Sequence, residues 1–261
     1  MRIHTLILAL MTGAAVSNVT HAALFDRGSG LIYDDILDVT WLQNANLAAT
    51  ETFGVSGINA NGSMNWDTAQ SWIEAMNAAE YLGYDDWRLP ETVPVNGIAF
   101  QYASTVNGTA DYGFNITSPN SELSHMYYVS LGLKGYVSTT GAYQADFGVF
   151  GNGTANGVDQ SSFGQEDVGL VQNLQAYSYW SGTEYEPDSN QAWHLITYFG
   201  GQDAHAKANS YFAWAVRSGD LTVPDINVTA VPEPESYALL LAGLGFVGYA
   251  ARRKSRRVAA Q

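Results

Sequence analysis

The stretch "NWDTAQSWIEAMNAAEYLGYDDWRLP", residues 65–90, decides the expected fold because it joins an amphipathic helix to an abrupt stop. Asn65 can cap the first turn and Gly83 can end the helix, which predicts a helix over residues 65–82. Pro90 then pushes the preceding residue into extended backbone. The apolar positions follow helical spacing and predict one buried face that covers a sheet: Trp66, Ala69, Ile73 and Met76.

The segments on either side of this helix are β-like. Residues 24–43 predict two short strands joined by a tight turn at Asp34 and Asp35, and residues 177–220 predict strands joined by Gly and Asn turns, closing in a hairpin. Residues 92–175 are rich in Gly, Asn, Ser and Thr and predict a loop-rich insertion with one short helix, "SELSHMYYVSLG". Such an insertion carries a binding function or is variable padding, and the sequence leaves both open.

The helix, the "WRLP" that follows it and the last block of strands together resemble a known family. The matching elements are Trp41-Leu42, residues 65–90 and "YWSGTEYEPDSNQAWHLITYFGGQDAHAKANSYFAWAVR" at residues 179–217. They resemble the Lcl C-terminal domain family, found in bacterial surface adhesins and in many uncharacterised secreted proteins. The resemblance implies an α+β, C-type-lectin-like fold over residues 23–220, shared with the formylglycine-generating enzymes. Those relatives use their own cysteines, and this chain has none, so their oxidase chemistry is not inherited.

The family motif consists of Trp87, Arg88, Leu89 and Pro90, and physical chemistry also predicts a structural role for it. Arg88 is one of five strong bases between residues 23 and 231 and stands beside two aspartates. We expect it to form a structural ion pair or to clamp backbone carbonyls, with Trp87 and Leu89 packed beneath it.

Charge excludes one class of function. Residues 23–231 contain five strong bases against 23 acids, a net charge of −18. A body so short of cations will not neutralise the phosphates of a nucleic acid. The absence of cysteine removes thiol catalysis and disulfides, so a core rich in Trp and Tyr must hold the domain together.

Both ends of the chain carry targeting signals. Residues 1–22 have a short basic start, an apolar run and small residues before the cleavage point, which predicts a signal peptide read by the Sec translocon. At the other end, residues 221–235 form a linker, residues 236–251 predict a short transmembrane helix, and residues 252–261 predict a basic cytoplasmic tail. The sorting motif and the basic cluster that closes the helix are Val231, Pro232, Glu233 and Pro234, then Arg252, Arg253 and Lys254.

This order of motif, helix and basic end resembles the PEP-CTERM sorting signal of Gram-negative bacteria that make exopolysaccharide. The resemblance implies cleavage by an exosortase, a membrane cysteine protease. We therefore expect export across the inner membrane, temporary retention there, and release to the cell surface or extracellular matrix.

Candidate ligand contacts lie in the last block of strands. Trp180 and Trp193 are the expected aromatic contacts for a glycan. Calcium is the one cofactor that the sequence raises, through three acids in "TEYEPDSN": Glu184, Glu186 and Asp188. These acids do not match an EF-hand loop, and a solvated turn is the better default. His194 and His205 can face each other across the predicted hairpin, but no short His-x-x-x-His spacing supports a zinc site.

Three functions fit these features. The first is a non-enzymatic, lectin-like surface or matrix protein that binds exopolysaccharide or another surface glycan in a biofilm. The second is a secreted hydrolase or metal-dependent enzyme that acts on extracellular polymer. The third is a structural matrix protein without a specific ligand. The first is the function that we expect, because no local motif of a nucleophile or of a phosphate loop is present.

Overall fold

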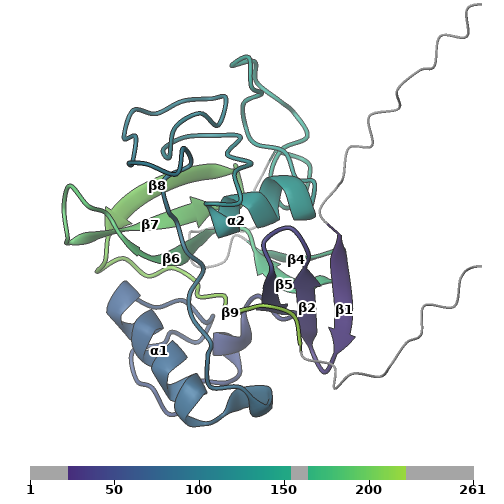
Figure 1. Ribbon diagram of the computed structural model, residues 1–261, viewed down its shortest axis with the longest axis vertical. Helices are drawn as coiled ribbons and strands as arrows, with labels where there is room; N and C mark the ends of the chain where they lie inside the picture. Colours follow the sequence, from purple (N-terminus) through teal and green to yellow (C-terminus); the bar gives the residue numbers. More distant parts are fainter. Residues whose placement is uncertain (1–22, 154–163, 222–261) are drawn as a thin grey trace, which may run out of the picture. The chain divides into compact units, whose positions relative to one another are not determined.

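The computed structural model describes residues 23–153 and 164–221, which belong to one compact unit ending at Leu221 (Figure 1). The predicted signal peptide, transmembrane helix and basic tail lie outside the described residues. In the described part of the chain, no helix has the length and apolar character that crossing a bilayer requires. The regular secondary structure of the described residues is mostly β-sheet, with few helices.

The first sheet joins the beginning of the unit to its end. Its strands are antiparallel and lie in the order β1-β2-β3-β9: β1 (Leu24–Gly28), β2 (Leu31–Asp34), β3 (Val39–Leu42) and β9 (Val216–Ser218). The turn predicted between the two strands is confirmed, because the carboxylate of Asp34 accepts hydrogen bonds from the backbone N–H of Ile36 and Leu37 at 3.1 and 3.0 Å. Asp34 is fully buried and also accepts from the hydroxyl of Ser130.

The predicted helix is α1 (Trp66–Ala78), and the Asn65 side chain caps it by accepting from the N–H of Thr68 at 2.8 Å. Its buried residues are Ala69, Trp72, Ile73 and Met76. The helix ends four residues before the predicted end. Glu80 and Leu82 both have positive φ, so the chain leaves the right-handed helical region before Gly83. A short 3₁₀ turn, Tyr81–Gly83, follows.

The second sheet is antiparallel, in the order β6-β7-β8: β6 (Ser178–Glu184), β7 (Gln191–Ile196) and β8 (Gly201–Ala206). The predicted closing hairpin forms between β7 and β8, but the segment that follows does not join it as predicted. Residues 211–215 do not pair with β7; they cross between the sheets through bridges of Met64 to Tyr211 and Tyr179 to Phe212. The chain then pairs β9 with β3, so its end completes the first sheet.

The loop-rich insertion contains the expected short helix, α2 (Glu122–His125), which continues as a π-helical turn, Met126–Ser130. It also contains a two-stranded sheet, β4 (Gln165–Val168) with β5 (Val171–Gln175). In Figure 1 its long loops and α1 lie at opposite ends of the unit. The insertion is joined to β8 through Gln202, whose N–H and C=O pair with Gly113 at 2.8 and 3.0 Å and whose side-chain amide donates to the Asp111 carbonyl.

Tryptophans fill the cysteine-free core. Trp41, Trp72, Trp180 and Trp193 are all fully buried. A buried indole N–H usually finds a hydrogen-bond partner, although those of Trp41 and Trp193 have none among the described residues. Trp72 donates to the Glu51 carbonyl at 2.9 Å and Trp180 to the Met64 carbonyl at 3.0 Å, so these side chains connect loops as well as fill space.

Candidate functional site

A cleft of about 850 Å³ opens beside the second sheet. One wall is the loop at residues 59–63, and the other is formed by the start of β6, the end of β7 and the segment after β8. Its lining is aromatic and polar, and includes Tyr177, Tyr198, Tyr211, Asn59, Asn209 and His205. Among the described residues that line it there is no acid, lysine or arginine, so the cleft suits a neutral polar ligand.

The tyrosines of the cleft remain protonated at neutral pH. Burial raises the pKa of Tyr177 and of Tyr198 above its ordinary value, and it raises the pKa of Tyr211 to about 12. The rings of Tyr177 and Tyr211 meet edge to face, with their centroids 5.6 Å apart. The cleft therefore combines rigid apolar ring faces with neutral hydroxyl and amide groups that can donate and accept hydrogen bonds.

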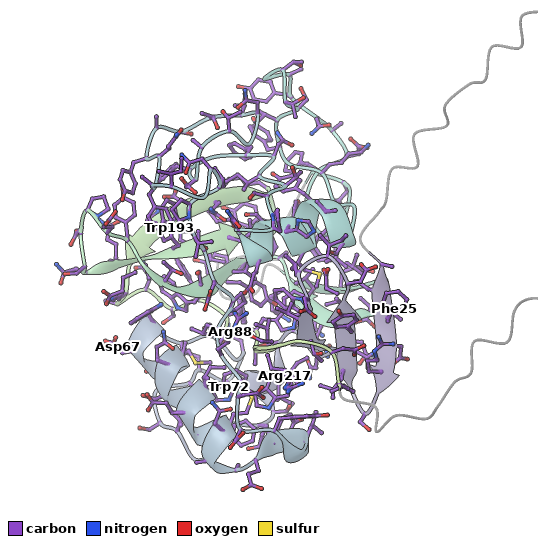
Figure 2. The ribbon with its side chains drawn as sticks, viewed as in Figure 1. Phe25, Asp67, Trp72, Arg88, Trp193 and Arg217 are labelled. Carbon is purple, nitrogen blue, oxygen red and sulfur yellow. The ribbon has the colours of Figure 1, made fainter. Side chains whose placement is uncertain are left out.

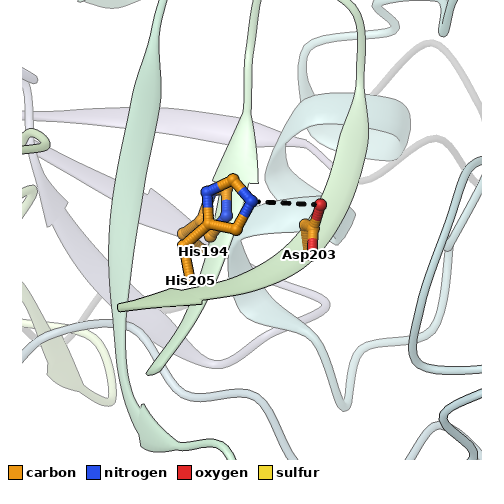
Figure 3. Close-up of side chains that lie close together, drawn as sticks. All are labelled: His194, Asp203 and His205. Carbon is orange, nitrogen blue, oxygen red and sulfur yellow. Dashed lines mark ion pairs between the residues drawn. The ribbon is translucent and has the colours of Figure 1, made fainter. Parts of the chain in front are cut away.

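One residue of the cleft, His205, belongs to a group of three potential metal ligands with His194 and Asp203 (Figure 3). The ring of His205, which also lines the cleft, lies 4.7 Å from the ring of His194, centroid to centroid. Its Nε2 is 3.6 Å from a carboxylate oxygen of Asp203. The predicted meeting of His194 and His205 is confirmed, although Asp203 was not expected beside them.

His194 has an unusual environment for a polar side chain. It is 1% exposed, and neither ring nitrogen has a hydrogen-bond partner among the described residues. Burial, and then the nearby His205, hold the pKa of His194 well below its ordinary value. The ring is therefore neutral at physiological pH, the state in which imidazole binds metals.

The two predicted tryptophan contacts require correction. Trp180 and Trp193 are each 0% exposed, so neither reaches a ligand at the surface. Trp193, which is labelled in Figure 2, is covered by aromatic side chains of the insertion, with the ring centroids of Phe100 and Tyr112 at 5.5 and 6.2 Å from its own. Both tryptophans are therefore part of the buried core, and the insertion covers one of them, Trp193.

The acids predicted as calcium candidates do not gather around one point. Glu184 pairs with Lys207, and Glu186 accepts a hydrogen bond from the hydroxyl of Tyr102 at 2.7 Å. Asp188 accepts from the backbone and side-chain amide of Asn190, both at 3.0 Å. These separate partners favour the alternative interpretation, a solvated turn.

The motif around Arg88 packs as the sequence suggests, with a different acidic partner. Trp87 and Leu89 are each 2% exposed. The guanidinium of Arg88, which is labelled in Figure 2, donates to both carboxylate oxygens of Glu122, each at 2.7 Å, and to the carbonyl of Leu89 at 3.1 Å. Asp86, one of the neighbouring acids, pairs with Arg217 instead.

Comparison with known proteins gives two matches. The family described as the Lcl C-terminal domain matches residues 30–217, and the PEP-CTERM protein-sorting motif matches residues 230–257. No curated protein matches the chain, and neither does any solved structure. The sorting motif implies processing by an exosortase and export to the cell envelope or surface.

Proposed function

The chain belongs to the Lcl C-terminal domain family, and from this premise we propose that it is a non-enzymatic, lectin-like protein of the cell surface or extracellular matrix. Its ligand is a neutral segment of exopolysaccharide or another surface glycan. We propose in addition that the domain has the C-type-lectin-like fold that the family resemblance implies. The sorting motif supports the location, because an exosortase substrate is exported before it is processed.

The observation that carries the proposal is the cleft beside the second sheet. Sugars present apolar C–H faces and hydroxyl edges, which match tyrosine rings and asparagine amides. The net charge of −18 over residues 23–231 would repel an acidic polysaccharide, whereas the uncharged lining accepts a neutral one.

Binding of the full chain to neutral and acidic polysaccharides tests this proposal. We expect neutral polysaccharide to bind, and Tyr177→Ala and Tyr198→Ala to weaken that binding at least about tenfold, the loss of one good contact. Tyr143→Ala is the matched control, because this tyrosine is 76% exposed and lies outside the cleft. Equal binding by all three variants would place the ligand elsewhere.

A second function has one observation in its favour. The cluster of His194, Asp203 and His205 beside the cleft fits a metal-dependent enzyme that acts on extracellular polymer. Shortening of the bound polysaccharide during incubation with pure protein would replace the lectin-like proposal with this one. If the chain neither binds nor shortens any polymer, a structural matrix protein is left.

The proposed route to the surface has its own test. A chain without residues 231–257 should no longer be shortened by an exosortase and should change its location, because it lacks the sorting motif and the basic end. The mass of each chain on a gel and its cell fraction give the readout. A full chain that keeps its unprocessed mass, together with the same location for both chains, would contradict sorting.

A further inference from the structure

The pairing of β7 with β8 brings three metal-ligating side chains to one face of the sheet. His194 lies directly opposite Asp203 in the antiparallel register, and His205 follows Asp203 by two residues. Residues opposite each other, and residues two apart on a strand, project from the same face. Their potential ligand atoms all lie within 4.8 Å of one another, without any rearrangement of the backbone.

His194 points to a missing partner at this position. A buried polar group is normally hydrogen-bonded, and each exception calls for an explanation. The imidazole of His194 is 1% exposed and has no hydrogen-bond partner among the described residues, yet it faces the ring of His205. An ion bound between the two rings would accept the lone pair of one ring nitrogen of His194 and so supply one of the two missing partners.

The other two side chains are held by outer partners. Nδ1 of His205 lies 2.6 Å from the hydroxyl of Tyr211, which leaves its Nε2 directed at Asp203. One carboxylate oxygen of Asp203 accepts from the N–H of Ala204 at 2.6 Å, and the carboxylate is also hydrogen-bonded by Tyr112. Bonds of this kind orient the ligands of metal centres and fix the tautomer of a ligating histidine.

We propose that His194, Asp203 and His205 bind a divalent transition-metal ion of the zinc type. Two imidazoles and one carboxylate suit zinc and its neighbours in the first transition row, whereas calcium takes six to eight oxygen ligands. Ligand atoms bound to one zinc ion at about 2.0–2.2 Å lie within about 4 Å of each other. Small rotations of the partly exposed Asp203 and His205 side chains close that difference.

The site would leave the ion incompletely surrounded by protein. Three protein ligands leave at least one position of a tetrahedral zinc ion for water or another ligand. Because His205 also lines the cleft, that position would lie at the edge of the cleft. This inference does not depend on glycan binding, since the metal can be measured without any sugar.

Titration of the chelator-treated full chain with Zn²⁺ tests the site, with a calorimetric stoichiometry and a thermal unfolding midpoint as readouts. Co²⁺ adds a spectroscopic check, because its visible absorption reports nitrogen and oxygen ligands around the ion. We expect one Zn²⁺ per chain and a higher midpoint with metal. Losing an outer partner of a metal site weakens affinity about 10–100-fold, so losing a direct ligand should cost at least that much.

Four variants locate the ion. His205→Gln, Asp203→Asn and His194→Phe should each lose the metal-dependent midpoint shift, whereas the matched control His125→Gln should keep it. His125 is also a buried histidine, but it lies on α2, away from the cluster in the chain, and its Nδ1 bonds the Thr117 carbonyl at 2.8 Å. If His194→Phe does not fold, His205→Gln and Asp203→Asn carry the test, because the side chains of His205 and Asp203 are 45% and 24% exposed.

Three results would overturn the proposal. One is a full chain that takes up no Zn²⁺ and shows no midpoint shift. Another is a His205→Gln variant that binds Zn²⁺ as tightly as the unaltered chain. The third is an equal loss of binding in His125→Gln, which would indicate non-specific uptake by histidines.

Discussion

Removing the Glu122 carboxylate should destabilise the whole unit, because it leaves the Arg88 guanidinium without its charge partner. Glu122 accepts both hydrogen bonds of the guanidinium fork, and it also accepts the N–H of Glu91 at 2.6 Å. Its side chain is 11% exposed and that of Arg88 27%. Solvent therefore replaces little of what Glu122→Ala removes.

The expected loss follows from that burial. Removing one partner of a fully buried ion pair lowers the free energy of unfolding by about 3–5 kcal/mol. The partial exposure of Arg88 lowers this to about 2–4 kcal/mol, since water reaches part of its guanidinium. For a domain of this size, each kcal/mol shifts the thermal midpoint by about 2–4 °C, so we expect a fall of about 4–16 °C.

Thermal unfolding followed by circular dichroism measures this fall, and a double-mutant cycle assigns it to the pair. Arg88→Met combined with Glu122→Met should cost less than the sum of the two single changes, because the double variant leaves no unpaired buried charge. Asp146→Ala is the control, since it breaks an ion pair with Lys134 whose two side chains are more than half exposed. Strict additivity in the cycle, or an equal fall for the control, would refute the reasoning.

Three further predictions concern other contacts of the unit. Gly113→Ala should lower the free energy of unfolding by at least about 1–3 kcal/mol, because Gly113 has a φ of +118° and an added Cβ would lie 2.0 Å from the backbone oxygen of Thr105. In thermal unfolding, Gly151→Ala is the control and should lose less, because nothing lies within 4 Å of its added Cβ. The hydrogen bonds from Arg27 lower the pKa of Asp220, so their stabilisation is present above about pH 4 and is lost as pH falls through the lower folded pKa. Asp220→Asn should therefore flatten the acid side of a stability–pH curve, and an unchanged curve would contradict this. Trp193→Ala should cost about 3–5 kcal/mol in urea unfolding, and full stability would contradict its place in the core.

Local signals predicted the elements whose stability is local. The capped helix α1 and the turn at Asp34 form where the sequence places them, because their hydrogen bonds join residues two to four apart. The end of α1 was missed, because positive φ at Glu80 and Leu82 is set by the chain that follows. There the side chain of Asn77 bonds both the N–H and the C=O of Trp87.

Contacts between residues far apart in the chain could not be predicted from the sequence. Arg88 stands next to acids in the chain, yet it pairs with a glutamate 34 residues away on α2. That contact, together with the pairing of Gly113 with Gln202, changes the interpretation of the insertion. A segment with little regular structure still covers Trp193 and supplies the counter-charge of the family motif, so in this chain it is part of the fold.

The grouping of the three candidate metal ligands could likewise not be predicted from the sequence alone. The spacing Asp203-x-His205 on one strand, opposite a histidine on the strand before it, is a readable signal only when the register between the strands is known. A shift of that register by one residue would turn His194 to the opposite face from Asp203 and His205. The cleft is harder still, because its loop at residues 59–63 and its tyrosines come from segments more than a hundred residues apart. The candidate metal ligands and the residues of the cleft therefore come together only in the folded unit, and the sequence alone shows them as separate parts.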